Sequence, residues 1–128
     1  MKLLLDTHLL LWAAGEPEKL SGECRALLED IDNEPIFSVA SLWEIVIKNG
    51  LRRDDFRADA ASIRRGLVDN GFEELPIAAP HVVALEALPL IHKDPFDRIL
   101  IAQAIVEGVT LLTVDQMVAR YPEPIRKL

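Results

Sequence analysis

The sequence has little cysteine and no long hydrophobic run, and each shortage excludes a class of protein. Its one cysteine, Cys24, cannot form a disulfide within the chain, which excludes a disulfide framework. No apolar run approaches the roughly 18 residues that a membrane span needs. Asp6 and His8 interrupt the apolar start too early for an export signal. We therefore expect a cytoplasmic protein with no membrane partner.

Basic residues are also in the minority, since 14 Lys and Arg face 21 Asp and Glu, for a formal net charge of −7. A nucleic-acid partner usually meets a basic surface, so this balance argues mildly against one. One stretch, residues 48–65, is net positive. Its basic residues are Lys48, Arg52, Arg53, Arg57, Arg64 and Arg65. This stretch is typical of a solvated helical face, and a rim that contacts phosphates beside an acidic pocket is the alternative.

The length and composition indicate a single domain over residues 1–128. Half of the residues are hydrophobic and 27% are charged, which is typical of a globular chain rather than a disordered one. A chain of this length can bury roughly two-thirds of its surface and so build its own core. We find no internal repeat, low-complexity stretch or linker that would divide it.

Short apolar runs alternate with segments of helical periodicity along the chain. The predicted strands are residues 3–5, 36–37, 72–77 and 109–114. The predicted helices are residues 8–14, 21–31, 39–49, 59–70, 80–87, 95–107 and a short one after Asp115. Ser21, Ser38, Asp59 and Asp94 suit the N-cap position, and Pro95 suits the first turn. The alternation predicts an α/β fold with a parallel, doubly wound sheet and helices on both faces.

Four acidic residues follow strands or lie on helices close behind them. They are Asp6, Glu44, Asp97 and Asp115. The carboxyl ends of parallel strands converge on one crevice, so the four side chains could meet there. Singly, Asp97 and Asp115 could serve only at helix starts, and Glu44 could form a surface ion pair with Lys48. Asp6 follows three leucines directly, where a charge is costly unless other groups satisfy it.

If the four acids converge, a compensating charge becomes necessary. Two carboxylates about 4 Å apart repel by on the order of 4 kcal/mol at an effective dielectric near 20. Mg²⁺ and Mn²⁺ prefer oxygen ligands and commonly retain waters that can act as nucleophiles. The histidines do not form a zinc-binding group with Cys24; we interpret His8, His81 and His92 as helix-surface or loop residues. The acids therefore predict metal-dependent chemistry on a phosphate.

Four ordered segments together resemble the PIN-domain family, and within it the VapC-type toxins of toxin–antitoxin pairs. The segments are MKLLLDTHLLLWA, SVASLWEIVIKNGL, LPLIHKDPFDRILIAQAIVEG and TLLTVD. The similarity extends from Met1 to about Tyr121. It implies a three-layer α/β/α sandwich with a short parallel sheet and an acidic pocket that binds Mg²⁺ or Mn²⁺.

The resemblance also assigns the site residues. The family's four acids correspond to Asp6, Glu44, Asp97 and Asp115. Asp94 competes with Asp97, but its position before Pro95 suits a helix cap. Many relatives carry Asn after the first acid, where this chain has Thr7; its hydroxyl can still orient a carboxylate or a water. Further candidate supporting hydroxyls are those of Ser38, Ser41 and Thr113, although Ser38 also suits a helix cap and Thr113 a strand.

The activity implied by the resemblance is metal-dependent endoribonuclease activity. One or two metal ions would activate water for attack on the RNA phosphodiester, leaving a 5′-phosphate and a 3′-hydroxyl. Asp6, Asp97 and Asp115 would be ligands directly or through water, and Glu44 would either ligate or orient the water. The resemblance further implies a homodimer and an inhibitory antitoxin. Candidate antitoxin contacts are Trp12, Trp43 and Phe56.

Two other protein classes with an acidic pocket fit the sequence less well. A phosphoacceptor receiver domain needs paired acids after the first strand and a lysine after the last, and LLLDTH and LLTVDQ supply neither. A haloacid-type phosphatase needs Asp-x-Asp, whereas His8 occupies the second acidic position. A non-catalytic module that binds nucleic acid or protein on the same fold stays open as the alternative.

Overall fold

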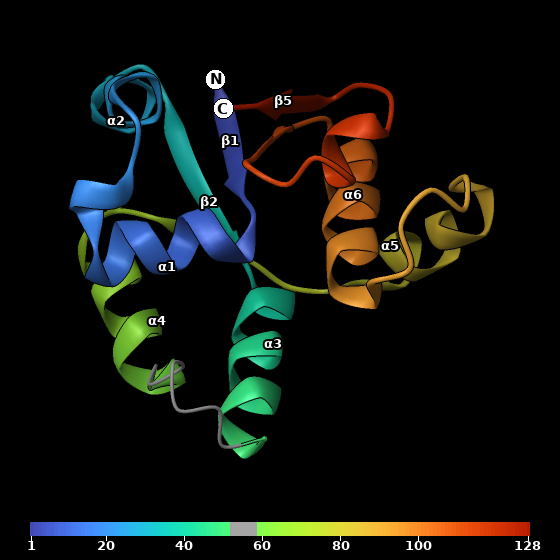
Figure 1. The fold of residues 1–128 in the computed structure, drawn as a ribbon, viewed down its shortest axis with the longest axis horizontal. Helices are drawn as coiled ribbons and strands as arrows, with labels where there is room; N and C mark the ends of the chain where they lie inside the picture. The colour runs from blue at the N-terminus through green and yellow to red at the C-terminus, as the bar shows by residue number, and fades with distance from the viewer. Residues whose placement is uncertain (52–58) are drawn as a thin grey trace.

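The computed structural model describes residues 1–51 and 59–128, and these form a five-stranded parallel sheet (Figure 1). The strand order is β3-β2-β1-β4-β5. The strands are β1 (Lys2–Leu5), β2 (Glu34–Ser38), β3 (Glu73–Leu75), β4 (Thr110–Thr113) and β5 (Ile125–Lys127). Strands β2 and β3 are added in turn on one side of β1, and β4 and β5 are then added on its other side. The switch point therefore lies between β1 and β4, where α/β sheets form their ligand crevice.

Six α-helices accompany the sheet in the described part of the chain. They are α1 (Thr7–Gly15), α2 (Gly22–Glu29), α3 (Val39–Gly50), α4 (Ala60–Asp69), α5 (Ala79–Ala84) and α6 (Pro95–Glu107). Short 3₁₀ helices are η1 (Pro17–Lys19), η2 (Leu85–Ala87) and η3 (Val118–Arg120). Figure 1 shows α1, α2 and α4 on one side of β1 and β2, with α5 and α6 on the other. The predicted α/β/α sandwich is therefore confirmed.

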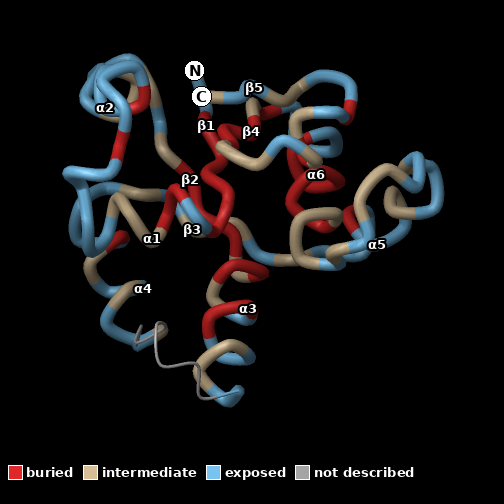
Figure 2. The backbone as a smooth tube through the Cα atoms, viewed as in Figure 1, coloured by how far each residue is buried: buried red, intermediate tan, exposed pale blue. Residues whose placement is uncertain are grey.

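Side-chain alternation along the strands produces a separate core on each face of the sheet. Leu3 and Leu5 pack with Leu9 and Leu10 of α1 on one face, whereas Leu4 joins the core under α6 on the other. This follows from the two-residue period of a strand. All three leucines of β1 are fully buried, and Figure 2 shows burial concentrated in the central strands and α6. A central strand buried on both faces explains the continuous apolar run in the sequence.

The predicted helix starts are confirmed by hydrogen bonds from side chains to backbone. Ser21, Ser38, Asp59 and Asp94 each accept a backbone N–H of the first turn. Helix α6 ends at Gly108, whose φ of 67° is the left-handed conformation that favours glycine. The structure contains no helix long and apolar enough to cross a membrane, within the residues it describes.

Several local predictions were wrong. The segment after Asp115 is a turn followed by η3 instead of a helix that Asp115 starts. The predicted helix over residues 80–87 is the short α5 continued by η2. Strand β5 was not predicted. His81 is buried rather than on the surface: its Nδ1 accepts the Ala78 N–H, so its Nε2–H donates to Glu107 at 2.8 Å.

Candidate active site

Asp6 lies at the carboxyl end of β1 and is anchored by three hydrogen bonds. Its Oδ1 accepts the backbone N–H of Leu9 at 2.8 Å, which makes Asp6 the N-cap of α1. Its Oδ2 accepts the Thr113 hydroxyl at 2.5 Å and the Val114 N–H at 3.3 Å. Burial nevertheless raises the pKa of Asp6 above its ordinary value, because the hydrogen bonds only partly offset the loss of water.

Asp115 lies beside Asp6, because β4 is the neighbour of β1 in the sheet. Its backbone N–H donates to the hydroxyl of Thr113 at 3.0 Å, so Thr113 connects Asp6 and Asp115. Oδ1 of Asp115 accepts the N–H groups of Met117 and Val118 at 2.7 and 3.1 Å. The two strand-end acids therefore meet at one edge of the sheet, as the sequence predicted.

Glu44 comes to the site from α3, one turn into that helix. Its Oε2 pairs with Nζ of Lys48 at 2.8 Å, as the sequence spacing allowed. The pair is not an ordinary surface pair, because Glu44 is only 6% exposed. Its Oε1 is buried without a hydrogen-bond partner among the described residues. A buried, unsatisfied carboxylate oxygen is costly, so this atom is suited to binding a cation.

Asp97 enters from the first turn of α6. Its Oδ2 lies 2.7 Å from Nε2 of His92 in the preceding loop. Asp94 uses Oδ1 to cap the helix by accepting the N–H groups of Phe96 and Asp97. Burial raises the pKa of Asp97 to about 6; the charges of Asp94 and Glu44 add to the rise, whereas His92 opposes it.

His92 is the residue of this site that sequence reasoning missed. Ligand atoms of His92, Asp94 and Asp97 lie within 4.8 Å of one another, close enough to share a metal ion. The only signal available was the position of His92 in LIHKDPFD, five residues before Asp97. Because the contact crosses a loop, no helical or strand periodicity indicated it.

The four hydroxyl residues predicted to support the acids differ in whether they contact one of them. Thr113 contacts Asp6, as described above. Thr7 donates to Oγ of Ser41 at 2.9 Å, a buried bond that joins the start of α1 to α3. Ser38 instead donates to Gln103 at 2.6 Å and accepts the Ala40 N–H. Within the described residues, the hydrogen bonds of Ser38 thus support the start of α3 and not one of the four acids.

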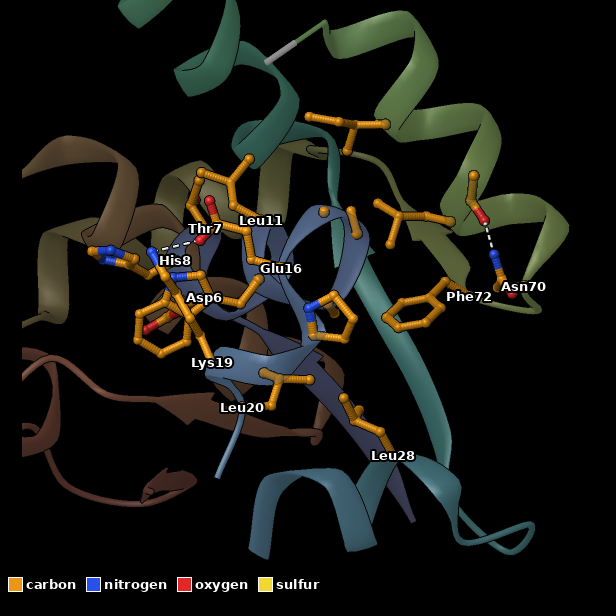
Figure 3. A pocket seen from close by; sticks show the side chains of 18 of the residues that line it. Asp6, Thr7, His8, Leu11, Glu16, Lys19, Leu20, Leu28, Asn70 and Phe72 are labelled. Atoms are coloured by element: carbon orange, nitrogen blue, oxygen red, sulfur yellow. Dashed lines mark hydrogen bonds and ion pairs between the residues drawn. The ribbon is translucent and has the colours of Figure 1, made fainter. Parts of the chain in front are cut away.

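All four acids line one cleft of about 1540 Å³, together with Asp94 and Lys48. The cleft continues from the acids along α1 towards α4. In Figure 3, Thr7 and His8 lie near Asp6, whereas Leu20, Leu28 and Phe72 line the more distant wall. The site therefore combines an acidic end with a long, partly apolar extension.

The donor set of the acidic end fits a hard divalent cation. Its candidate ligand atoms are carboxylate oxygens from four separate elements, which suit Mg²⁺ or Mn²⁺. Oε1 of Glu44, which has no partner within residues 1–51 and 59–128, supplies a buried site for positive charge. Three basic residues of the predicted rim, Arg52, Arg53 and Arg57, lie outside the described residues, as does Phe56.

The fold and the site together define the class of protein. It is an α/β protein whose acidic site lies at the carboxyl ends of its parallel strands, beside the switch point of the sheet. The PIN domain family model matches residues 3–124, and the chain belongs to that family. Comparison with curated protein sequences gives no significant match.

Solved structures of toxin–antitoxin complexes share the fold. The VapBC2 complex of Rickettsia felis, bound to promoter DNA, aligns with a TM-score of 0.71 at 17% identity, covering 99% of this chain and 98% of that one. DNA-bound VapBC from Salmonella typhimurium gives 0.65 at 15% identity, covering 99% and 98%. A toxin–antitoxin complex from Klebsiella pneumoniae gives 0.63 at 17% identity, covering 97% and 95%.

Proposed function

We propose that the protein is a Mg²⁺- or Mn²⁺-dependent endoribonuclease and the toxin of a type II toxin–antitoxin pair. The observation that carries the proposal is Oε1 of Glu44, which is buried and has no hydrogen-bond partner in the part of the chain that the structure describes, in a cleft shared with Asp6, Asp97 and Asp115. Membership of the PIN domain family supports nuclease activity. The similar folds in solved toxin–antitoxin complexes support the toxin role.

The residues of the site have distinct roles in this proposal. Asp6, Glu44, Asp97 and Asp115 would hold the metal, which when bound neutralises phosphate charge and lowers the pKa of a water. Three hydrogen bonds fix the carboxylate of Asp6, so it is oriented before any ligand arrives. The remaining acids have freer oxygens: Oε1 of Glu44 can ligate or orient a water. His92 holds Asp97 in position.

We propose an antitoxin segment as the partner that covers the cleft. The apolar wall formed by residues such as Leu20, Leu28 and Phe72 offers a surface for apolar side chains, and the acids attract a basic one. Trp12 lines this cleft. Trp43 is 56% exposed and packs edge-on against Phe96, so part of its ring is open to a partner.

The proposal also includes a homodimer in solution. Apolar side chains remain exposed on two helices, with Val82 and Val83 on α5 and Trp43 and Val46 on α3. Exposed apolar surface of this kind is compatible with a protein interface. Light scattering at micromolar concentration should give twice the mass of the 14.3 kDa chain, and a monomer mass would count against this element.

The central experiment incubates the purified protein with total RNA, with and without Mg²⁺ or Mn²⁺, and maps the new ends. We expect cleavage only with metal, leaving 5′-phosphate and 3′-hydroxyl ends. Products with 2′,3′-cyclic phosphates would exclude attack by water.

Asp6→Asn is the matched variant for that experiment. We expect it to abolish cleavage because the metal loses a carboxylate. The metal-free variant should still fold, at a cost of about 1–3 kcal/mol in the free energy of unfolding. The amide keeps the cap oxygen for Leu9, but its NH₂ group cannot accept the hydrogen bonds from Thr113 and Val114. Full cleavage by this variant, or metal-independent RNA binding that the variant retains, would favour the non-catalytic module instead.

A further inference from the structure

A lysine lies against the acids of the cleft. Nζ of Lys48 is 2.8 Å from Oε2 of Glu44, one helical turn away on α3. The side chain of Lys48 is 39% exposed, whereas that of Glu44 is 7% exposed. Both line the cleft that contains Asp6, Asp97 and Asp115. Lys48 therefore reaches a buried carboxylate from the solvent side of the acidic end.

The geometry of this pair differs from that of an ordinary helical ion pair. Exposed pairs at this spacing contribute only a few tenths of a kcal/mol and have no defined role in a site. Here the lysine satisfies one oxygen of Glu44 and leaves Oε1 without a partner in the described structure. The ammonium thus supplies positive charge to the carboxylate of Glu44 but pairs with only one of its two oxygens. A divalent cation at this position would supply more.

Lys48 and a metal ion would compete for Glu44. Both are cations, and at a separation of a few ångströms they repel each other. The four-carbon stem of lysine allows its ammonium to move while its backbone stays in α3. When metal and RNA are bound, an anion for the displaced ammonium is available in the phosphate itself. A point charge of this kind commonly serves as a phosphate ligand.

We propose that Lys48 is a catalytic residue that exchanges partners: it holds Glu44 in the metal-free protein and contacts a non-bridging oxygen of the RNA phosphate in the loaded one. The inference rests on the proposed nuclease function and adds a residue to it. No covalent bond forms or breaks at Lys48. Its contribution is positive charge where negative charge develops in the transition state.

The exchange makes a prediction about metal affinity that needs no RNA. Lys48→Met removes the competing charge, so the dissociation constant of Mn²⁺ should fall about tenfold, as expected for losing one nearby like charge. Titration calorimetry of the full chain measures it. If Lys48 only clamped Glu44 in place, the same substitution would loosen the carboxylate and weaken Mn²⁺ binding. The sign of the change separates the two roles.

The control variant is Lys2→Met, which makes the same substitution in another lysine–glutamate pair. Lys2 lies 3.7 Å from Glu73 at the opposite end of β1 from the acids. The Lys2→Met substitution should leave the affinity for Mn²⁺ unchanged. If Lys48→Met does not fold, judged by its thermal transition, Lys48→Gln replaces it: the amide can still donate to Glu44 but carries no charge.

The second measurement is RNA cleavage at saturating Mn²⁺. Lys48→Met should reduce kcat/KM by about 10²- to 10³-fold, the range seen when one transition-state donor is removed. The slope of log affinity against log salt for RNA binding should fall by about 0.7, as for one lost phosphate contact on a single strand. Lys48→Arg should recover most of the activity, because it retains the charge.

The outcomes separate the two proposals. If the wild-type protein cleaves RNA but Lys48→Met binds Mn²⁺ more weakly, or cleaves at the wild-type rate, Lys48 is not the exchanging residue and the nuclease function stands. If the wild-type protein binds Mn²⁺ but cleaves no RNA, the proposed function fails, and the role of Lys48 in catalysis fails with it. Tighter Mn²⁺ binding together with lost cleavage supports both.

Discussion

At the scale of single residues, the site contains two acids, Asp6 and Asp97, whose charged form is disfavoured by burial. Burial raises the pKa values of both Asp6 and Asp97, and for Asp97 the value reaches about 6. The folded protein therefore holds the proton of Asp97 more tightly than the unfolded chain, whose value is near 3.8. At neutral pH the charged form of Asp97 therefore destabilises the folded state. Acids with strongly shifted pKa values cluster at functional sites, where residues are arranged for binding rather than for stability.

The raised pKa of Asp97 predicts how stability depends on pH. An acid with a raised folded pKa favours the folded state most at low pH, and this advantage is lost as pH rises from about 4 to about 6. Asp97→Asn should therefore stabilise the metal-free protein by about 1–2 kcal/mol more at pH 7.5 than at pH 4.5, after allowance for solvent screening. Urea unfolding at the two pH values measures the difference. Equal effects at both would contradict the assignment.

The sequence predicted that the four acids would lie together, and they line one cleft, but it did not predict all of their contacts. The cap role predicted for Asp94 is confirmed, since its position before Pro95 is a local signal. The burial of Glu44 was not predictable from its spacing to Lys48, because the same spacing occurs on any exposed helix. His92 was missed because its contact with Asp97 depends on the path of a loop.

At the scale of elements, the loop before α6 is held by a network centred on Arg98 and Tyr121. The Arg98 guanidinium donates to the carbonyl oxygens of Leu85 and Pro89 and to the Tyr121 hydroxyl. The same hydroxyl accepts the backbone N–H of His92 at 2.9 Å. The network therefore fixes the loop that brings His92 to Asp97.

Tyr121→Phe tests whether this network positions His92. The ring would remain in the core, where Tyr121 is 4% exposed, while the His92 N–H loses its acceptor. We expect a cost of about 1 kcal/mol in the free energy of unfolding and faster amide exchange at residues 88–93. Exchange in α2 provides the internal control. Unchanged protection at His92 would show that the loop is held by other contacts.

Helices whose ends are marked by capping residues, proline or glycine were predicted from the sequence, whereas strand β5 was not. Helix α6 begins at Asp94-Pro95 and ends at Gly108, and both signals are readable in the sequence. Strand β5 is only three residues long and follows Pro124, and its pairing partner β4 is known only once the fold exists. The helix predicted over residues 80–87 has the correct extent, but its last turn is the 3₁₀ helix η2, which ends before Leu88-Pro89.

At the scale of the whole molecule, the alternation of strands and helices was enough to predict a parallel sheet. It was not enough to predict the order of the strands in that sheet. Whether β4 pairs with β1 or with β3 depends on which side of the sheet the chain crosses, and no short segment encodes that choice. The pairing of β1 with β4 is what places Asp115 beside Asp6. The site is therefore a product of topology, and the family resemblance supplied the expectation that its parts converge.

A ligand that binds acids from four elements should stabilise the entire fold. Mn²⁺ at 100 times its dissociation constant should raise the free energy of unfolding by about 2.7 kcal/mol, and Tm by roughly 10 °C. Differential scanning calorimetry measures the shift, and EDTA should reverse it. Asp115→Asn should lose most of the gain at the same Mn²⁺ concentration. A Tm independent of Mn²⁺ would argue against a metal site in this cleft.

The hydroxyl of Thr113 connects two acids from opposite ends of the chain, and this has a consequence for synthesis. Asp6 precedes Thr113 by 107 residues, so the ribosome makes Asp6 well before it makes Thr113 and Asp115. Because β4 supplies one side of the crevice, a nascent or prematurely terminated chain that lacks it has only part of the acidic cluster. Under the proposed nuclease function, chains that still lack β4 are expected to be inactive, which a cleavage assay of a chain truncated before Val109 would test.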